Sequence, residues 1–169
     1  MVFSSNAFIF FFLPITLGLY FASLRLKNAR KASNIVLTIM SLLFYAWGEP
    51  KFVFVMLASV AINWLVALAI NKYKVENKPS RAKAVLTAGV IINVLLLGVF
   101  KYAGFAVRNF NLIFNTDAAV PQIALPIGIS FFTFQAMSYI IDVYRGKGTT
   151  QKRFGGVFLY LAFFPLLIA

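Results

Sequence analysis

Polar side chains that could take part in hydrogen bonding or proton transfer occur within one apolar stretch, Leu125 to Gly146. Gln135, Ser138 and Asp142 follow one another at spacings i, i+3 and i+7, which place them along one side of a helix. Ser130 precedes them in the same stretch. Because an ionisable group in hydrocarbon costs ~2.5–3.5 kcal/mol on insertion scales, such a group indicates function by default. We therefore predict that these four side chains line a polar cavity.

Asp142 also has a purely structural interpretation. Arg145 follows it by three residues, a spacing at which two side chains are neighbours on a helix. A local salt bridge would explain the carboxylate without any catalytic role. Gln135 has no charged or polar neighbour that explains it in this way, so it is the first of the four to examine for function.

The residue types exclude several kinds of chemistry. The 169 residues contain no cysteine, no histidine and only four acidic residues. Disulfides, thiol nucleophiles and thiolate metal sites are therefore excluded, and the commonest general base and metal ligand is missing. We expect no catalytic residue and no metal site within this chain.

The composition indicates a membrane protein. Hydrophobic residues make up 62% of the chain and charged residues 12%, whereas a soluble domain has about 25% charged residues. A perpendicular helix needs ~20 apolar residues to cross a bilayer. We predict an all-α polytopic membrane protein, with residues 1–169 forming one membrane domain. Six apolar segments occupy residues 6–24, 34–48, 52–70, 84–101, 123–143 and 154–169.

The positive charges predict an orientation. The net charge is +12, but the Lys and Arg residues cluster in short loops between apolar segments, which argues against nucleic acid as a partner. All but three of the 16 lie in loops 25–33, 71–83 and 144–153, which fall on one side if every segment crosses once. Since cytoplasmic loops are enriched in Lys and Arg, we predict that these loops are cytoplasmic and that the N-terminus is outside. Lys51, Lys101 and Arg108 remain on the outer side.

Residues 101–115 have the pattern of an amphipathic helix. Apolar side chains recur at i, i+4, i+7 and i+11, and Lys101, Gly104 and Arg108 lie on the opposite face. We predict a helix on the outer surface of the membrane. The alternative is that it extends the fourth apolar segment into solvent.

Other polar residues and prolines interrupt the apolar segments. We expect the polar side chains to form hydrogen bonds between helices, because lipid offers none. Pro126 and Gly128 predict irregular backbone where the fifth segment begins. The polar residues at helical spacing are Asn34, Thr38, Ser41 and Tyr45 in the second segment and Ser59 and Asn63 in the third, whereas Asn93 stands alone in the fourth.

The last apolar run, Val157 to Ala169, is too short to cross the hydrocarbon and would leave a carboxylate inside it. This predicts that the chain is truncated within a sixth membrane segment. A short re-entrant hairpin is the alternative.

Several stretches resemble the membrane-bound O-acyltransferases, and most closely their alginate O-acetyltransferase branch. They are the opening MVFSSNAFIFFFLPITLGLYF, FYAWGEPKF at 44–52, GVFKYAGF at 98–105, the block Leu125–Gly146 and the final YLAFFPLLIA. The resemblance implies a many-helix bundle in the bacterial inner membrane that moves acetyl groups from a cytoplasmic thioester, such as acetyl-CoA, to a polysaccharide or cell-wall hydroxyl. It also implies periplasmic acetyltransferase proteins as partners.

The resemblance places the family's key histidine in the second half of the protein. This chain has no histidine, so it corresponds to an N-terminal portion that we expect to be inactive alone. Two other classes remain open on the residues alone. The polar stripes would suit part of a transporter or channel, although no inverted repeat is evident, and a small structural membrane protein is the third class.

Overall fold

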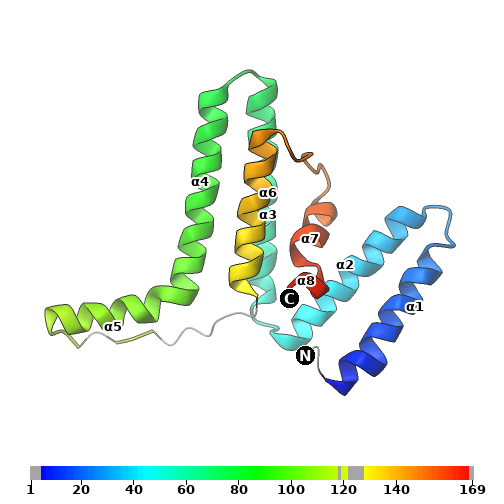
Figure 1. The fold of residues 1–169 in the computed structure, drawn as a ribbon, viewed down its shortest axis with the longest axis horizontal. Helices are drawn as coiled ribbons and strands as arrows, with labels where there is room; N and C mark the ends of the chain where they lie inside the picture. The colour runs from blue at the N-terminus through cyan, green and yellow to red at the C-terminus, as the bar shows by residue number, and fades with distance from the viewer. Residues whose placement is uncertain (1–4, 118, 122–127, 168–169) are drawn as a thin grey trace.

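The computed structural model describes residues 5–117, 119–121 and 128–167, and every regular element in these ranges is a helix (Figure 1). The predicted all-α fold is therefore confirmed for the described residues. The elements in chain order are η1 (Phe8–Phe12), α1 (Leu13–Ser23), α2 (Ala29–Gly48), α3 (Val53–Val75), α4 (Pro79–Leu97), η2 (Gly98–Tyr102), α5 (Ala103–Phe114), α6 (Ile129–Arg145), α7 (Phe154–Ala162) and α8 (Phe164–Leu167).

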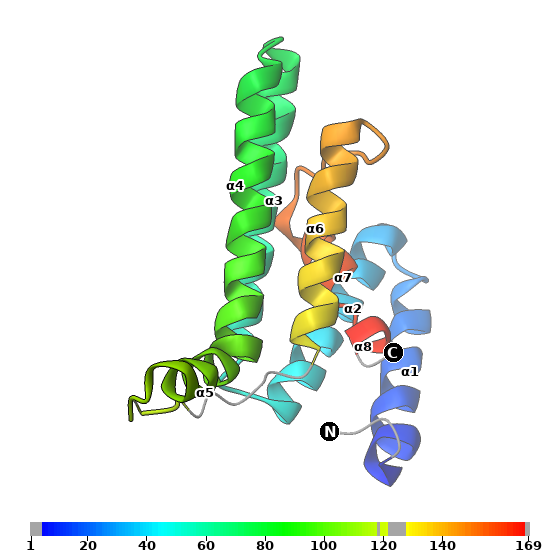
Figure 2. The same cartoon turned by 60° about the vertical axis from the view of Figure 1, so that its left-hand side comes forward.

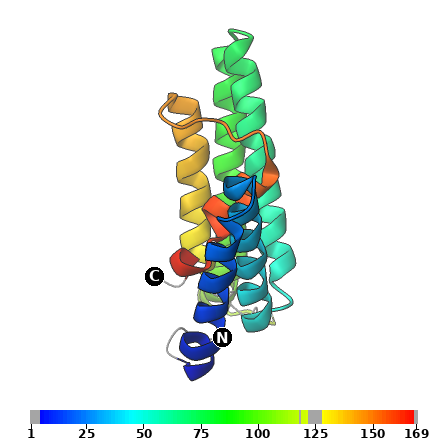
Figure 3. The same cartoon turned by 90° about the vertical axis from the view of Figure 1, so that its right-hand side faces the viewer.

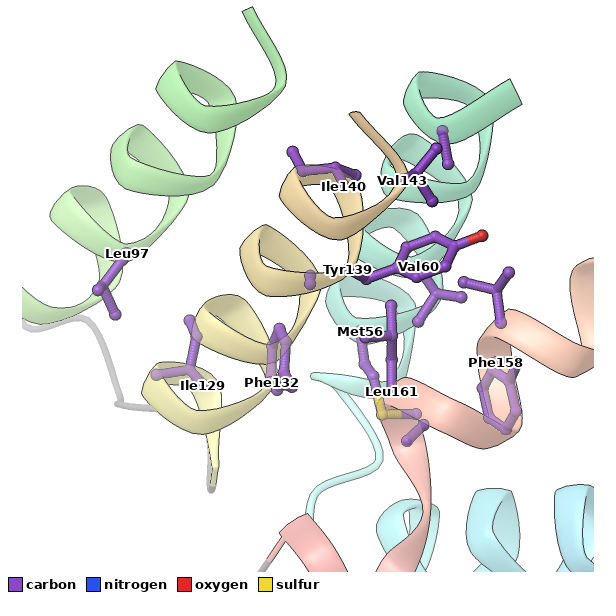
Figure 4. Close-up of a cluster of buried hydrophobic side chains, with 14 of the residues drawn as sticks. Met56, Val60, Leu97, Ile129, Phe132, Tyr139, Ile140, Val143, Phe158 and Leu161 are labelled. Atoms are coloured by element: carbon purple, nitrogen blue, oxygen red, sulfur yellow. The ribbon is translucent and has the colours of Figure 1, made fainter. Parts of the chain in front are cut away.

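Helices α3, α4 and α6 pack against one another in pairs and form a three-helix bundle (Figures 1 and 2). Gly89 of α4 allows the close approach. A Cβ added there would lie 2.8 Å from Cγ1 of Val66 and 3.0 Å from Cδ1 of Ile140, so a larger residue would push α3 and α6 away. The bundle core also includes Met56 and Phe132, which are almost fully buried (Figure 4).

Helices α1 and α2 form a second unit beside the bundle, and α7 joins the two. Figure 3 shows α1 and α2 side by side in front of the bundle. α7 packs on both α2 and α3, and its Phe158 and Leu161 face the bundle core (Figure 4). Phe8, Phe44 and Phe164 form a smaller buried cluster where η1, α2 and α8 meet.

The three basic loops join helix ends that point the same way in Figure 1, although the loop between α1 and α2 lies well below that between α3 and α4. They are, however, shorter than the sequence predicts. α2 already begins at Ala29, so Arg30 and Lys31 belong to its first turn. Likewise Lys72 and Lys74 lie in the last turn of α3, and α4 begins at Pro79. The prediction was wrong about these bounds because long basic side chains can extend from a helix end into water, so charge does not by itself end a helix.

Two helical stretches of the described residues are long and apolar enough to cross a membrane: Val53–Val75, and Pro79–Phe114, which includes α4, η2 and α5. Phe8–Ser23 is apolar but shorter. Two such stretches do not amount to the predicted six. The fifth segment begins as a helix only at Ile129, and Leu125 and Pro126 lie outside the described residues. Gly128 has a φ of 74°, so the backbone is irregular at the predicted place.

The chain changes direction after α4. The π-helical turn η2 leads into α5, which points away from the axis of α4 in both Figure 1 and Figure 2. The predicted amphipathic helix therefore exists as Ala103–Phe114, and it does not continue straight on from α4. π-helical turns of this kind occur mostly as local insertions, often at functional sites.

Candidate functional site

The end of α6 is fixed by a helix cap and by a lysine from α3. Gly146 has a φ of 75°, and the N–H of Lys147 donates to the carbonyl of Asp142 at 3.0 Å, as in a Schellman motif. Lys74 Nζ donates to the carbonyl of Tyr144 at 2.9 Å. A cation at this place also stabilises the negative end of the helix dipole. The position of Asp142 is therefore set by α3 as well as by α6.

The structure places the four predicted residues in different surroundings. Asp142 is half-buried and lines a hollow against α7. Gln135 donates from Nε2 to the carbonyl of Tyr160 in α7 at 2.7 Å. Ser138 is exposed and Ser130 is half-buried. Gln135 and Asp142 thus both face α7, whereas the role of all four residues in a cavity stays a prediction.

The alternative interpretation of Asp142 is not supported. No ion pair joins its carboxylate to Arg145 among the described residues, and Arg145 is exposed. The ion pair found in these ranges joins Lys78 to Glu76 at 2.7 Å. The carboxylate of Asp142 is therefore available at the edge of the hollow.

Three hollows meet around Gln151, in the basic connection between α6 and α7, and Gly156 in the first turn of α7. Their volumes are about 240, 390 and 460 Å³. The first is the hollow beside Asp142, which also contains the side chains of Tyr139 and Tyr160. The second includes Arg153. Taken together, the hollows are lined by polar and apolar side chains of α2, α6, α7 and the connection before α7.

Gln151 is held in place by two helices. Its N–H donates to the hydroxyl of Tyr139 at 3.2 Å, and its carbonyl accepts a hydrogen bond from the indole N–H of Trp64 at 3.1 Å. Gly156 leaves room for the Gln151 side chain, since a Cβ there would lie 3.3 Å from Oε1. Sequence reasoning missed Gln151, although it is the neutral residue directly before Lys152 and Arg153.

The last apolar segment is broken in the middle, which corrects the prediction of one membrane segment at 154–169. α7 ends at Ala162, Phe163 is extended with φ −65° and ψ 116°, and α8 starts at Phe164. Pro165 explains the break, because it has no N–H for the carbonyl of Leu161 and its ring clashes with the preceding turn. A break of this kind frees backbone groups that must find new partners.

Two of the predicted polar stripes supply those partners. The carbonyl of Tyr160 accepts from Gln135 of α6, and the N–H of Phe164 donates to Oγ of Ser41 in α2 at 3.3 Å. The amide oxygen of Gln135, Oε1, is buried without a hydrogen-bond partner in the part of the chain that the structure describes. Gln135 is not among the residues that line the three hollows around Gln151.

The comparison with curated proteins identifies the relatives of this chain. It is 40% identical over its whole length to the probable alginate O-acetylase AlgI of Pseudomonas syringae pv. tomato, and 39% identical to that of Pseudomonas aeruginosa. The chain is homologous to O-acetyltransferases. A peptidoglycan O-acetyltransferase of Helicobacter pylori is 36% identical over 90% of the chain. The resemblance predicted from the sequence is thereby confirmed.

The homology covers only part of each relative. The chain spans about a third of the length of the curated O-acetylases that it matches, at 32% of the two Pseudomonas proteins and 28% of the Helicobacter protein. No protein-family model and no solved structure matches the chain. The homology therefore relates the chain to one part of these proteins, and the structure contributes the local geometry.

Proposed function

We propose that this chain is part of a membrane O-acetyltransferase that acetylates a hydroxyl of an exopolysaccharide or a cell-wall polymer. The observation that carries this proposal is the identity of about 40% over the whole chain with alginate O-acetylases, together with the peptidoglycan O-acetyltransferase. The two named acceptors differ, but both are hydroxyl-bearing polymers outside the cytoplasm. The acceptor is therefore proposed as a class.

The proposed reaction moves an acetyl group from a thioester such as acetyl-CoA. The hydroxyl oxygen of the acceptor attacks the carbonyl carbon, the C–S bond breaks, and the proton of the hydroxyl leaves with the thiol by way of a base. The chain has no histidine or cysteine to serve as that base or as an acyl carrier. We propose that a histidine in another part of the protein takes the proton, as the resemblance implies, and that these 169 residues alone are inactive.

The proposed topology places these residues in the bacterial inner membrane, with the N-terminus in the periplasm, as the first portion of a longer membrane domain. Two observations support it. All but three of the 16 basic residues lie in or beside three connections, and those connections join helix ends that point the same way in Figure 1. α3, at 23 residues, is about 35 Å long, enough for ~30 Å of hydrocarbon. Periplasmic polysaccharide acetyltransferase proteins would then be partners at the opposite end.

We further propose that the hollows around Gln151 receive the thioester donor. Arg153 lines one of them and belongs to the basic connection 144–153 that this topology makes cytoplasmic, so it can bind a phosphate of coenzyme A. Asp142 lines the smallest of them, where a polar group of the donor could be held. This assigns binding to Asp142, and no proton transfer to any of the four residues predicted from the sequence.

The polar stripes do not favour a transporter. The amides of Asn63 and Asn93 are hydrogen-bonded to each other, and Ser41 is bonded to the backbone of α8. These groups therefore do not line a water-filled path through the bundle, as the transporter interpretation requires.

The function is tested with the full-length protein in lipid vesicles, by following labelled acetyl transfer from acetyl-CoA to an oligosaccharide acceptor. Arg153→Gln is expected to raise KM for acetyl-CoA with little change in kcat, and the exposed Ser138→Ala serves as the matched control. The absence of transfer by the wild-type protein with every acceptor polymer would contradict the function. Transfer by the 169 residues alone would instead contradict the proposal that the base lies elsewhere.

A further inference from the structure

A further hollow, of about 510 Å³, lies between η2, α5 and residues 120–121. α5 follows the end of α4 that is remote from the α3–α4 connection (Figures 1 and 2). The proposed acetyl transfer does not use it. Its walls include Lys101, Arg108 and Phe105. Lys101 and Arg108 are also two of the three basic residues outside the basic loops, so their presence together is not explained by the orientation of the helices.

The described residues do not neutralise the positive charge of this hollow. None of the four acidic residues of the chain lines it, and no ion pair holds Lys101 or Arg108 in the described ranges. Lys101 Nζ lies 5.6 Å from the centre of the Tyr102 ring, and Arg108 Nε donates to the carbonyl of Gly104 at 3.3 Å. That single bond orients the guanidinium and leaves its other N–H donors for an anion.

Gly104 determines how closely the wall of the hollow approaches α5. A Cβ at this position would lie 3.3 Å from the carbonyl oxygen of Pro121 and 3.8 Å from Nη2 of Arg108. A larger side chain would therefore narrow the hollow at the place where the guanidinium lies.

The surface next to the hollow is apolar. Leu112 is 81% exposed, Ile113 74% and Phe105 66%. α5 packs on η2 and points away from the three-helix bundle (Figure 2). A helix with basic side chains beside exposed apolar ones lies in the interface of a bilayer, where the apolar groups enter the acyl region. A water-soluble polyanion would neutralise the charge but would leave these side chains in water.

We propose that this hollow binds the headgroup of an anionic phospholipid. Lys101 and Arg108 hold the phosphate, and the acyl chains lie against the exposed apolar side chains of α5. The proposal depends on the membrane position of α4 and α5 and is independent of acetyl transfer.

The test uses the full chain in detergent micelles, titrated with a short-chain phosphatidylglycerol that is soluble as a monomer, and native mass spectrometry to count bound lipids. We expect saturable binding that weakens about tenfold or more in the double variant Lys101→Gln/Arg108→Gln, since hydrogen bonds to charged groups contribute about that factor. The variant Lys27→Gln/Arg30→Gln, which removes two exposed charges elsewhere, should bind as the wild type does. Circular dichroism verifies that both variants are folded.

Further ligands separate the possible sources of the anion. Equal binding of phosphatidylcholine with the same acyl chains would overturn the proposal that the hollow recognises an anionic headgroup. Inorganic phosphate or an oligouronate that binds as tightly as the lipid would overturn the assignment to a lipid.

A photo-reactive amino acid in place of Leu112 gives an independent measurement, in full-length protein within vesicles. A cross-link to phospholipid supports the proposal. A cross-link only to another part of the protein would show that protein covers this face and would overturn it.

Discussion

The molecule contains two places where side-chain amides are buried between helices, and they differ in whether the hydrogen bonds are complete. Asn63 of α3 and Asn93 of α4 donate to each other at 3.1 and 2.8 Å, and each also donates to a carbonyl of its own helix. Gln135, between α6 and α7, donates once and keeps Oε1 free. The closed pair can only join two helices, whereas the open amide supports a broken helix and keeps one buried acceptor without a partner.

The largest loss of stability is expected when the space beside the hydrogen-bonded pair Asn63 and Asn93 is filled. Gly89→Leu places a side chain where a Cβ alone would lie 2.8 Å from Val66, so we expect destabilisation by about 3 kcal/mol or more. Gly18→Leu in α1 is the matched control, because nothing lies within 4 Å of a Cβ there. Unfolding by denaturant in mixed micelles, followed by circular dichroism, measures both. Equal stability of the two variants would show that α3, α4 and α6 are not closely packed.

The Asn pair itself is tested by removing one amide and then both. Asn63→Leu leaves the buried amide of Asn93 without its partner, at a cost of about 1–3 kcal/mol. The double variant Asn63→Leu/Asn93→Leu should recover much of this loss, because neither polar group then remains buried. A double-mutant cycle on the unfolding free energies gives the coupling between them. Additive losses would contradict a closed pair.

Substitutions at the break after α7, where Gln135 has an unpaired oxygen, should have smaller effects on stability. Gln135→Leu leaves the carbonyl of Tyr160 without its donor, and we expect a loss of about 1 kcal/mol together with faster hydrogen exchange around α7. Ser41→Ala, which removes the acceptor for the N–H of Phe164, should have a similar or smaller effect. Exposed Ser138→Ala on the same helix is the control. If Gln135→Leu is as stable as the control, the amide does not support the break.

The comparison also shows what the sequence could predict. Asn63, Asn93 and Ser41 could be predicted to contact other helices, because a polar side chain in an apolar helix needs a hydrogen-bond partner that lipid does not supply. Gln135 could likewise be identified as a residue without a local partner. These predictions depend only on the period of a helix and the cost of an unpaired polar group, and both are local properties.

Other features could not be predicted because they depend on segments distant in sequence. Pro165 disfavours a continuous helix. The break at Phe163 is stable because α6 supplies a donor for the carbonyl of Tyr160 and α2 supplies an acceptor for the N–H of Phe164. Gln151 is held in position by a hydrogen bond from Trp64, which is 87 residues away in the chain. The spacing of residues along one helix does not predict contacts with segments that are distant in the sequence. The direction of α5 after η2 likewise follows from the backbone and not from the apolar pattern.

The smallest effect is expected where a polar pair is exposed. Lys78 Nζ and Glu76 Oε2 lie 2.7 Å apart in the connection between α3 and α4, and this hydrogen bond lowers the pKa of Glu76 and raises the pKa of Lys78. The stabilisation is complete between the two unfolded pKa values. It is lost as the pH falls through the lowered pKa of Glu76, or as it rises through the raised pKa of Lys78.

Glu76→Gln should therefore reduce the melting temperature slightly at neutral pH and not at acid pH, and high salt should reduce the difference. Thermal unfolding of the wild type and the variant at both pH values and both salt concentrations measures this. A neutral-pH loss as large as that of Asn63→Leu would mean that burial does not separate the two pairs, which differ in the structure chiefly in their exposure to water.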